Sequence, residues 1–244
     1  MPSIKRKRTN PLKSKKRRKF SSNNVQQNLI GKSSLKEIKC RDQVFSPGGT
    51  VSSTLLASVV YIEPTVAGLG LATGYTCINT LEQGNGVSQR IGNKVVIKSI
   101  MIQGMIAAPV TVDATDTGGV RVIVVYDKQT NGAAPAITEI IGNVSTAGGY
   151  ATGFNSPIKI TNKNRFVVLR DHIFPMGGNI DQASHSFKWF IKKQLETTYS
   201  STSSPPTVAN ITTGAIFLLT FIGAGQFTHS PDINDFNVRI RYED

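Results

Sequence analysis

The clearest pattern in the chain is a series of short stretches rich in Val, Ile, Leu and Phe, separated by turns that contain Gly, Pro or Asn. Alternation of apolar and polar positions over 4–8 residues is typical of strands. We therefore predict one strand that begins near residues 35–40 and ends at 45. Seven further strands are predicted over 52–62, 94–107, 120–126, 165–174, 185–195, 214–223 and 236–242. Residues 120–126 are almost all apolar, which predicts that both faces of that strand are covered.

Helical signal is almost absent from the chain, since only residues 136–141 predict a short helix. Long loops are predicted over 63–92, 128–163 and 196–213. Eight strands joined by long loops favour an all-β fold, the eight-stranded jelly-roll sandwich. A domain of about 200–250 residues is ordinary for this class, so we predict one jelly-roll domain over 35–244.

Alternation also predicts which side chains share a face. Val95, Ile97, Ser99 and Met101 are expected on one face of strand 94–107.

The basic residues of two later strands alternate with apolar ones. Lys188 and Lys192 are expected on the face of Phe190, and Arg239 and Arg241 share the face opposite Val238, Ile240 and Tyr242. One interpretation is a basic inner surface that contacts nucleic acid. The other is an ordinary solvated sheet face above an apolar core.

Charge changes the picture most at the start of the chain, where the first nineteen residues hold ten basic side chains and no acidic one. They are Lys5, Arg6, Lys7, Arg8, Lys13, Lys15, Lys16, Arg17, Arg18 and Lys19. The whole chain has 28 basic and 15 acidic residues, a formal net charge of +13, so the rest of the chain carries only +3. Residues 21–34 are polar and low in charge, typical of a linker.

A run of like charges repels itself, so we predict that residues 1–34 form a disordered arm and linker until they meet a polyanion. Nucleic acid is the expected partner, because each neutralised phosphate releases a counterion. Two basic clusters separated by four residues also suit a bipartite nuclear import signal, which implies a host import receptor. A merely solvated charge run is the alternative. Phe20 is either a base-stacking residue or a plain linker residue.

Other chemistry finds little support. The glycine clusters lack the spacing of dinucleotide or P-loop sites, and no Ser elbow, HExxH or convincing carboxylate pair indicates an enzyme. We expect no cofactor and no metal, although Asp113 with Asp116, or Asp232 with Asp235, could share calcium instead of forming turns. Two cysteines predict free thiols rather than a disulfide framework. No apolar run reaches the roughly 18 residues of a membrane span, and no secretory signal is seen.

Five motifs in order resemble the coat proteins of geminiviruses and related small circular single-stranded DNA viruses. They are Gln89-Arg90-Ile91-Gly92-Asn93-Lys94-Val95-Val96-Ile97, Val124-Val125-Tyr126-Asp127-Lys128, Asn164-Arg165-Phe166-Val167-Val168-Leu169-Arg170, Phe187-Lys188-Trp189-Phe190-Ile191-Lys192-Lys193 and Val238-Arg239-Ile240-Arg241-Tyr242. The resemblance implies a jelly-roll subunit of an icosahedral shell, with the arm on the packaged DNA and acting in nuclear import. The zinc-binding Cys and His residues proposed for plant relatives are not matched, because only Cys40 lies in that region and His172 is the first histidine.

The sequence therefore predicts a viral capsid protein of the virion and host nucleus, a homo-oligomer without catalytic activity. The rival interpretation is a cellular nucleic-acid-binding protein with a basic tail, of ribosomal or chromatin type. Such a protein would also be expected to carry basic residues over its body, whereas this body is nearly neutral. Phosphate chemistry does not separate DNA from RNA, so DNA rests on the resemblance alone.

Overall fold

The computed structural model describes residues 37–45, 60–61, 77–107, 117–142, 144–146, 149–151, 155–177, 184–200, 206–222 and 232–244. The chain divides into two units, Met1–Lys36 and Glu37–Asp244, and all the described residues belong to the second. The ten arm cations and Phe20 lie outside the described residues. The predicted disorder of the arm and its boundary at residues 34 and 35 therefore stay predictions.

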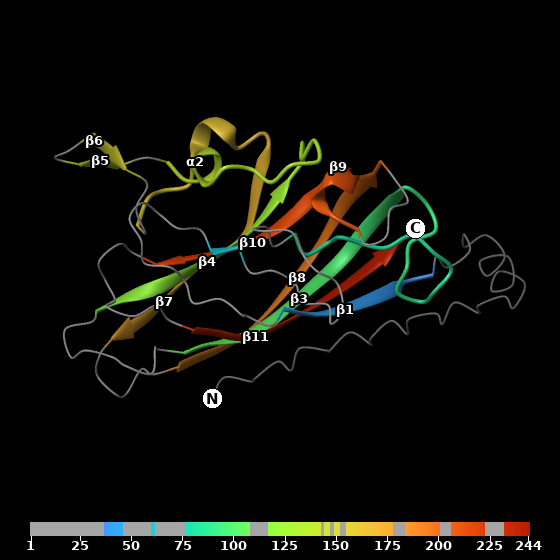
Figure 1. The fold of residues 1–244 in the computed structure, drawn as a ribbon, viewed down its shortest axis with the longest axis horizontal. Coiled ribbons are helices and arrows are strands. Elements are labelled where there is room, and N and C mark those ends of the chain that lie inside the picture. The colour runs from blue at the N-terminus through green and yellow to red at the C-terminus, as the bar shows by residue number, and fades with distance from the viewer. Residues whose placement is uncertain are drawn as a thin grey trace, which may run out of the picture. The chain divides into compact units, whose positions relative to one another are not determined.

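The described part is almost entirely β-structure (Figure 1). Its strands are β1 (Lys39–Phe45), β2 (Val60–Tyr61), β3 (Lys94–Ala107), β4 (Thr117–Asp127), β5 (Val144–Thr146), β6 (Gly149–Ala151), β7 (Phe166–Gly177), β8 (Ser184–Tyr199), β9 (Ile211–Thr213), β10 (Ala215–Ile222) and β11 (Asp232–Glu243). The helical segments are α2 (Ile137–Ile140) and the 3-10 turns η1 (Ile160–Asn162) and η3 (Val208–Asn210).

Two antiparallel sheets contain the eight predicted strands. One has the order β1-β11-β3-β8-β9 and the other β2-β10-β4-β7, with β5 and β6 as a separate hairpin. Strands that are neighbours in the sheets come from distant parts of the chain, and this exchange between two sheets is the jelly-roll arrangement. The predicted fold class is confirmed, with the three-residue β9 as an addition.

The apolar faces of the two sheets form one core. Phe174 of β7 stacks on Trp189 of β8 with ring centroids 6.0 Å apart, so β7 lies opposite β8 across the sandwich. Ile102, Val124 and Phe217 come from three different strands and are fully buried in the same core. Burial of such side chains stabilises the fold by roughly 1.5–3 kcal/mol each.

Several strands run further than the alternation predicted. β7 continues to Gly177, past its predicted end at residue 174, and β8 continues to Tyr199, past its predicted end at residue 195. Pro175 is tolerated because β7 is the edge strand of its sheet, where a missing N–H breaks no ladder. The predicted strand over 52–62 is described only at Val60–Tyr61, and its remainder lies outside the described residues.

The predicted face of β3 is wrong beyond Ile97. Val95 and Ile97 point into the core, but Ile100, Ile102 and Ile106 are the buried residues further along, so Met101 lies on the opposite face. The pairing of β3 with both β8 and β11 shifts register between Ile97 and Ser99. A β-bulge adds a residue and reverses the alternation that follows, which local periodicity does not reveal.

The long connection between β4 and β7 contains secondary structure and is hydrogen-bonded to the sheet. It contains α2, as predicted, and its residue Ser156 accepts a hydrogen bond of 2.7 Å from Arg121 of β4 through the backbone oxygen. Ile123 of β4 is fully buried. The prediction that both faces of this strand are covered is therefore confirmed.

Cys40 and Cys77 are free thiols, as predicted. Among the described residues, no helix is long and apolar enough to cross a membrane, and no group of three metal-ligating side chains occurs. Asp113 and Asp116 lie outside the described residues, and the side chains of Asp232 and Asp235 are not described, so the calcium hypothesis is untested.

Candidate nucleic-acid interface

The structure places the four predicted body residues on one sheet. On β11, Val238, Ile240 and Tyr242 are buried, so the intervening Arg239 and Arg241 point away from the core.

On β8 the same alternation buries Trp189 and exposes its two neighbours, Lys188 and Phe190, and also Lys192. The predicted grouping of these residues on their strands is confirmed.

Strand register brings the two sets together. β3 lies between β11 and β8, and Ser99 of β3 pairs with Arg241 on one side and Lys192 on the other. Met101 pairs in the same way with Arg239 and Phe190. With strands about 4.8 Å apart, the four basic residues form one surface of the five-stranded sheet, which we call the cationic face.

The charges of the cationic face differ in availability. Arg239 makes two hydrogen bonds to the Asp42 carboxylate, at 2.6 and 2.7 Å, and these bonds hold the pKa of Asp42 below its usual value. Lys188, Lys192 and Arg241 make no ion pair with any described residue. Three of the four predicted cations are therefore free to meet an external anion, and Arg239 is already engaged.

Apolar and amide side chains lie among these cations. Phe190 is 62% exposed and Met105 is 38% exposed, although both are large hydrophobic residues. A shallow hollow of about 440 Å³ is lined by Met105 together with Gln103, Lys188 and Asn237 among others. An exposed aromatic ring can stack on a base while neighbouring cations hold phosphates. Phe190 was predicted only as a neighbour of the lysines, and Gln103 and Asn237 were missed because amide groups alone carry no sequence signal.

Arg170 is a further cation that the sequence did not identify as a candidate. Its guanidinium lies 5.5 Å from the centroid of the Trp189 ring, where the edge of β7 meets β8. A second hollow, of about 320 Å³, lies there, lined by residues of both strands that include Arg170, Lys188 and Phe190. Lys188 therefore stands between the two hollows. Only the packing of one sheet on the other brings Arg170 to this position.

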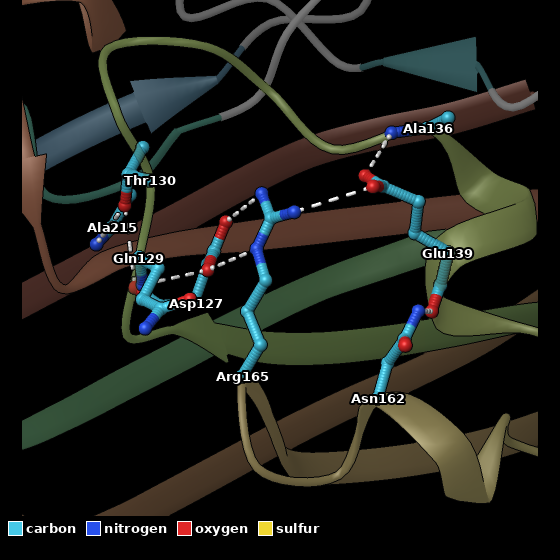
Figure 2. A network of polar contacts seen from close by, with 8 residues as sticks. All are labelled: Asp127, Gln129, Thr130, Ala136, Glu139, Asn162, Arg165 and Ala215. Carbon is cyan, nitrogen blue, oxygen red and sulfur yellow. Dashed lines mark hydrogen bonds and ion pairs between the residues drawn. The ribbon is translucent and has the colours of Figure 1, made fainter.

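Two of the sequence motifs meet in a structural network (Figure 2). Arg165 donates two hydrogen bonds to the fully buried Asp127 carboxylate, at 3.0 and 2.9 Å, and a third to Glu139 at 3.2 Å. The Asp127 hydrogen bond raises the pKa of Arg165. Figure 2 also shows Asn162 donating to the Glu139 backbone oxygen, at 2.8 Å, so the network ties the β4–β7 connection to the sheet.

Arg90, from another motif, is also structural. Its side chain is 1% exposed, donates to the backbone oxygens of Leu81 and Gly92 at 3.1 and 2.6 Å, and lies 4.2 Å from the Tyr199 ring centroid. Burial lowers the pKa of Arg90. Arg90 and Arg165 therefore hold loops in place, and they are not available to bind nucleic acid.

The jelly-roll body with its cationic sheet face matches a known protein family. A model of the geminivirus coat protein/nuclear export factor BR1 family matches residues 3–243, which is nearly the whole chain. The chain belongs to this family. The resemblance drawn from the five motifs is thereby confirmed, and a viral coat protein replaces the cellular ribosomal or chromatin alternative.

A curated relative agrees with this assignment. The coat protein of Maize white line mosaic satellite virus is 23% identical over 125 residues, which are 51% of this chain and 54% of that protein. The chain thus spans about half the length of this relative. Membership of this family supports a viral coat protein.

Proposed function

We propose that this coat protein assembles with copies of itself into a small icosahedral shell that packages single-stranded DNA through the basic N-terminal arm. The observation that carries the proposal is the concentration of ten cationic side chains in nineteen residues, ahead of a jelly-roll body of a coat protein family. Such a segment binds phosphate without regard to base sequence, because it offers no fixed donors to base edges.

The cationic face supports the same role. Lys188, Lys192 and Arg241 make no ion pair with a described residue, and the exposed Phe190 ring lies between the two lysines on β8. Residues two apart on a strand are about 7 Å apart, a spacing that suits a base on the ring with phosphates on either side. We place this face toward the packaged DNA, as a second and weaker contact after the arm.

Imaging and sedimentation of the purified full chain with single-stranded DNA test this proposal. Megadalton shells with a high ratio of absorbance at 260 and 280 nm are expected. Glutamine at all ten arm positions should lower that ratio sharply while the β body stays folded. Undiminished packaging by this variant would contradict the role of the arm and leave the cationic face as the binding surface.

The family name also includes a nuclear export factor, which is a second candidate function for this chain. A protein that binds single-stranded DNA but stays monomeric or dimeric across salt and pH would favour it over a shell protein.

We also propose that the arm is a nuclear import signal read by a host import receptor. A cytoplasmic reporter fused to residues 1–20 should enter the nucleus, and alanine at the ten arm cations should abolish entry. A reporter that remains cytoplasmic with the intact arm would refute import without affecting packaging.

A further inference from the structure

Described loops at one end of the sandwich are hydrogen-bonded to each other and to the strand ends. Asn131 N donates to Thr212 O at 3.0 Å, Gly214 N donates to Asp127 O at 3.0 Å, and Tyr199 N donates to Asn93 O at 2.7 Å. The described parts of the connections 77–93, 128–165 and 206–214 are therefore held by hydrogen bonds to one another and to the strand ends. Loops held in this way are preorganised for binding, since ordering them costs little entropy.

Three exposed apolar side chains lie on the β1 side of this surface. Ile38, Val87 and Ile91 are 58%, 83% and 59% exposed, and we call them the Ile91 patch. The patch is built on Asp244, whose carboxylate accepts hydrogen bonds from Ile91 N at 3.1 Å and from the buried Lys39 Nζ at 2.7 Å.

The turn that carries Val87 is closed from within. Gly86 N donates to Gln89 Oε1 at 2.9 Å, and Gln89 N donates to Gly86 O at 3.0 Å. Val87 is therefore held at the tip of a closed turn. The exposed Glu37 borders the patch beside Ile38 and makes no ion pair with a described residue.

A further exposed apolar residue lies on the β7 side. Ile160 is 75% exposed in η1, and the neighbouring Lys159 and Lys163 are exposed and make no ion pair with a described residue; we call these three the Ile160 patch. The backbone of Lys159 donates to Ile140 O at 2.8 Å, and Lys163 N donates to Ile160 O at 3.2 Å. The patch is therefore as firmly held as the Ile91 patch, and its rim is positive.

The two patches stand at opposite lateral edges of the sandwich. β1 is the first strand of the five-stranded sheet, and β7 lies across from β8 near the other edge of that sheet. Figure 1 likewise shows α2, whose Ile140 O accepts the hydrogen bond from Lys159 N, on the far side of the domain from β1 and the C-terminus. Copies placed side by side with the same end aligned would bring one patch against the other.

We propose that the Ile160 patch of one copy docks on the Ile91 patch of a second copy of this chain, head to tail. This contact rests on the proposed assembly and identifies one of its interfaces. It buries four apolar side chains that are otherwise exposed, and it opposes Lys159 and Lys163 to Glu37. A contact between different patches closes into a ring when the rotation between copies closes, as an axis of an icosahedral shell requires.

Acidic substitutions in the full chain test the contact first. Ile160→Asp and Ile91→Asp should each raise the protein concentration needed for assembly at least tenfold, measured by sedimentation. Thr213→Asp is the control, because it adds the same charge at an exposed site of the same end, outside both patches. Far-UV circular dichroism and thermal unfolding establish that each variant is folded. Assembly of both patch variants at the wild-type concentration would overturn the proposal.

Cross-linking tests the direction of the contact independently of stability. In a Cys40→Ser background, Val87→Cys combined with Ile160→Cys should give a ladder of covalent oligomers with a short bis-maleimide, whereas each single cysteine should give dimers at most. A charge exchange adds a rescue: Glu37→Lys should weaken assembly, and Lys159→Glu with Lys163→Glu should restore it.

The outcomes separate this contact from the proposed function. If wild-type protein forms particles, but the double-cysteine variant gives no ladder and the charge exchange gives no rescue, the contact alone is overturned. Wild-type protein that forms no particle at any concentration would overturn the proposed assembly, and the absence of a ladder from the concentrated protein would then overturn the contact too.

Discussion

At the scale of residues, buried charge holds this protein together more than it serves a ligand. Asp127 and Arg165 form a bidentate pair in which the carboxylate is fully buried, and Arg121 pairs with Asp171 at 2.6 Å on the same sheet. Removing one partner of such a pair typically costs about 3–5 kcal/mol, because the other charge is left buried and unpaired. The same chemistry explains why the basic residues of the motifs do not all contribute to the binding surface.

Arg90 allows a direct test of this structural role. Arg90→Met keeps much of the volume but removes the hydrogen bonds to Leu81 and Gly92 and the contact with the Tyr199 ring. We expect a loss of roughly 2–4 kcal/mol in the free energy of unfolding, from unsatisfied carbonyls and a lost cation–π contact. Urea unfolding of the subunit measures it, with Lys128→Met as an exposed control. A change below about 0.5 kcal/mol, the usual range of surface substitutions, would contradict the assigned role.

The two thiols should differ in reactivity. Burial raises the pKa of Cys77 to about 12, so its thiolate is scarce at pH 8, while Cys40 lies partly exposed on β1. Since the thiolate is the nucleophile, iodoacetamide at pH 8 should alkylate Cys40 and leave Cys77 unmodified until the protein unfolds. Peptide mass spectrometry measures both sites. Equal labelling of the folded protein would show that Cys77 is accessible.

At the scale of elements, the turn between β9 and β10 requires a glycine. Gly214 has φ +81°, and a Cβ there would lie 2.0 Å from Glu196 O. Its own oxygen accepts hydrogen bonds from Asn79 Nδ2 at 2.9 Å and Thr197 Oγ1 at 2.8 Å. The close approach of β8 to this turn requires a residue without a side chain.

Gly214→Ala should therefore destabilise the domain by more than about 2 kcal/mol, through a clash and an unfavourable backbone conformation. Gly92→Ala is the matched control, because its Cβ would meet no atom closer than 3.9 Å and its backbone is ordinary. Thermal unfolding of both variants decides the matter. Equal melting temperatures for the two would mean that the turn relaxes without cost.

At the scale of the whole molecule, the charge is divided unequally. The first nineteen residues carry ten cations, while most described carboxylates of the body already pair with body cations. The cations left over on the cationic face are few. The arm should therefore dominate nucleic-acid affinity, with a smaller contribution from the sheet.

This division predicts how binding depends on salt. Ten arm contacts give a slope of log K against log salt near −7, at about 0.7 per phosphate of a single strand, and three face contacts add about −2. Lys188→Ser, Lys192→Ser and Arg241→Ser together should reduce the slope by about 2. Lys128→Ser, at an exposed site outside the cationic face and outside both patches, is the control and should leave the slope nearly unchanged. Fluorescence anisotropy with labelled single-stranded DNA measures both, and equal slopes for the triple variant and the control would remove the cationic face from the binding surface.

The sequence by itself determined the β class, the strands and which side chains share a face along β8 and β11. It did so because strand alternation and turn residues are local properties, written within a few positions. The concentration of charge in the arm is likewise a property of composition. Where a local rule is broken by a neighbour, as at the bulge after Ile97, the prediction for β3 was wrong.

Only the tertiary structure decided what those side chains do. The order β1-β11-β3-β8 brings Arg241 and Lys192 into one row, joins Arg239 to Asp42 and so removes one predicted cation from the free surface. The packing of β7 on β8 adds Arg170 beside Trp189. These pairings join residues far apart in the chain, because hydrogen-bonded neighbours in a jelly roll are set by the topology of two sheets and not by the periodicity of any one strand.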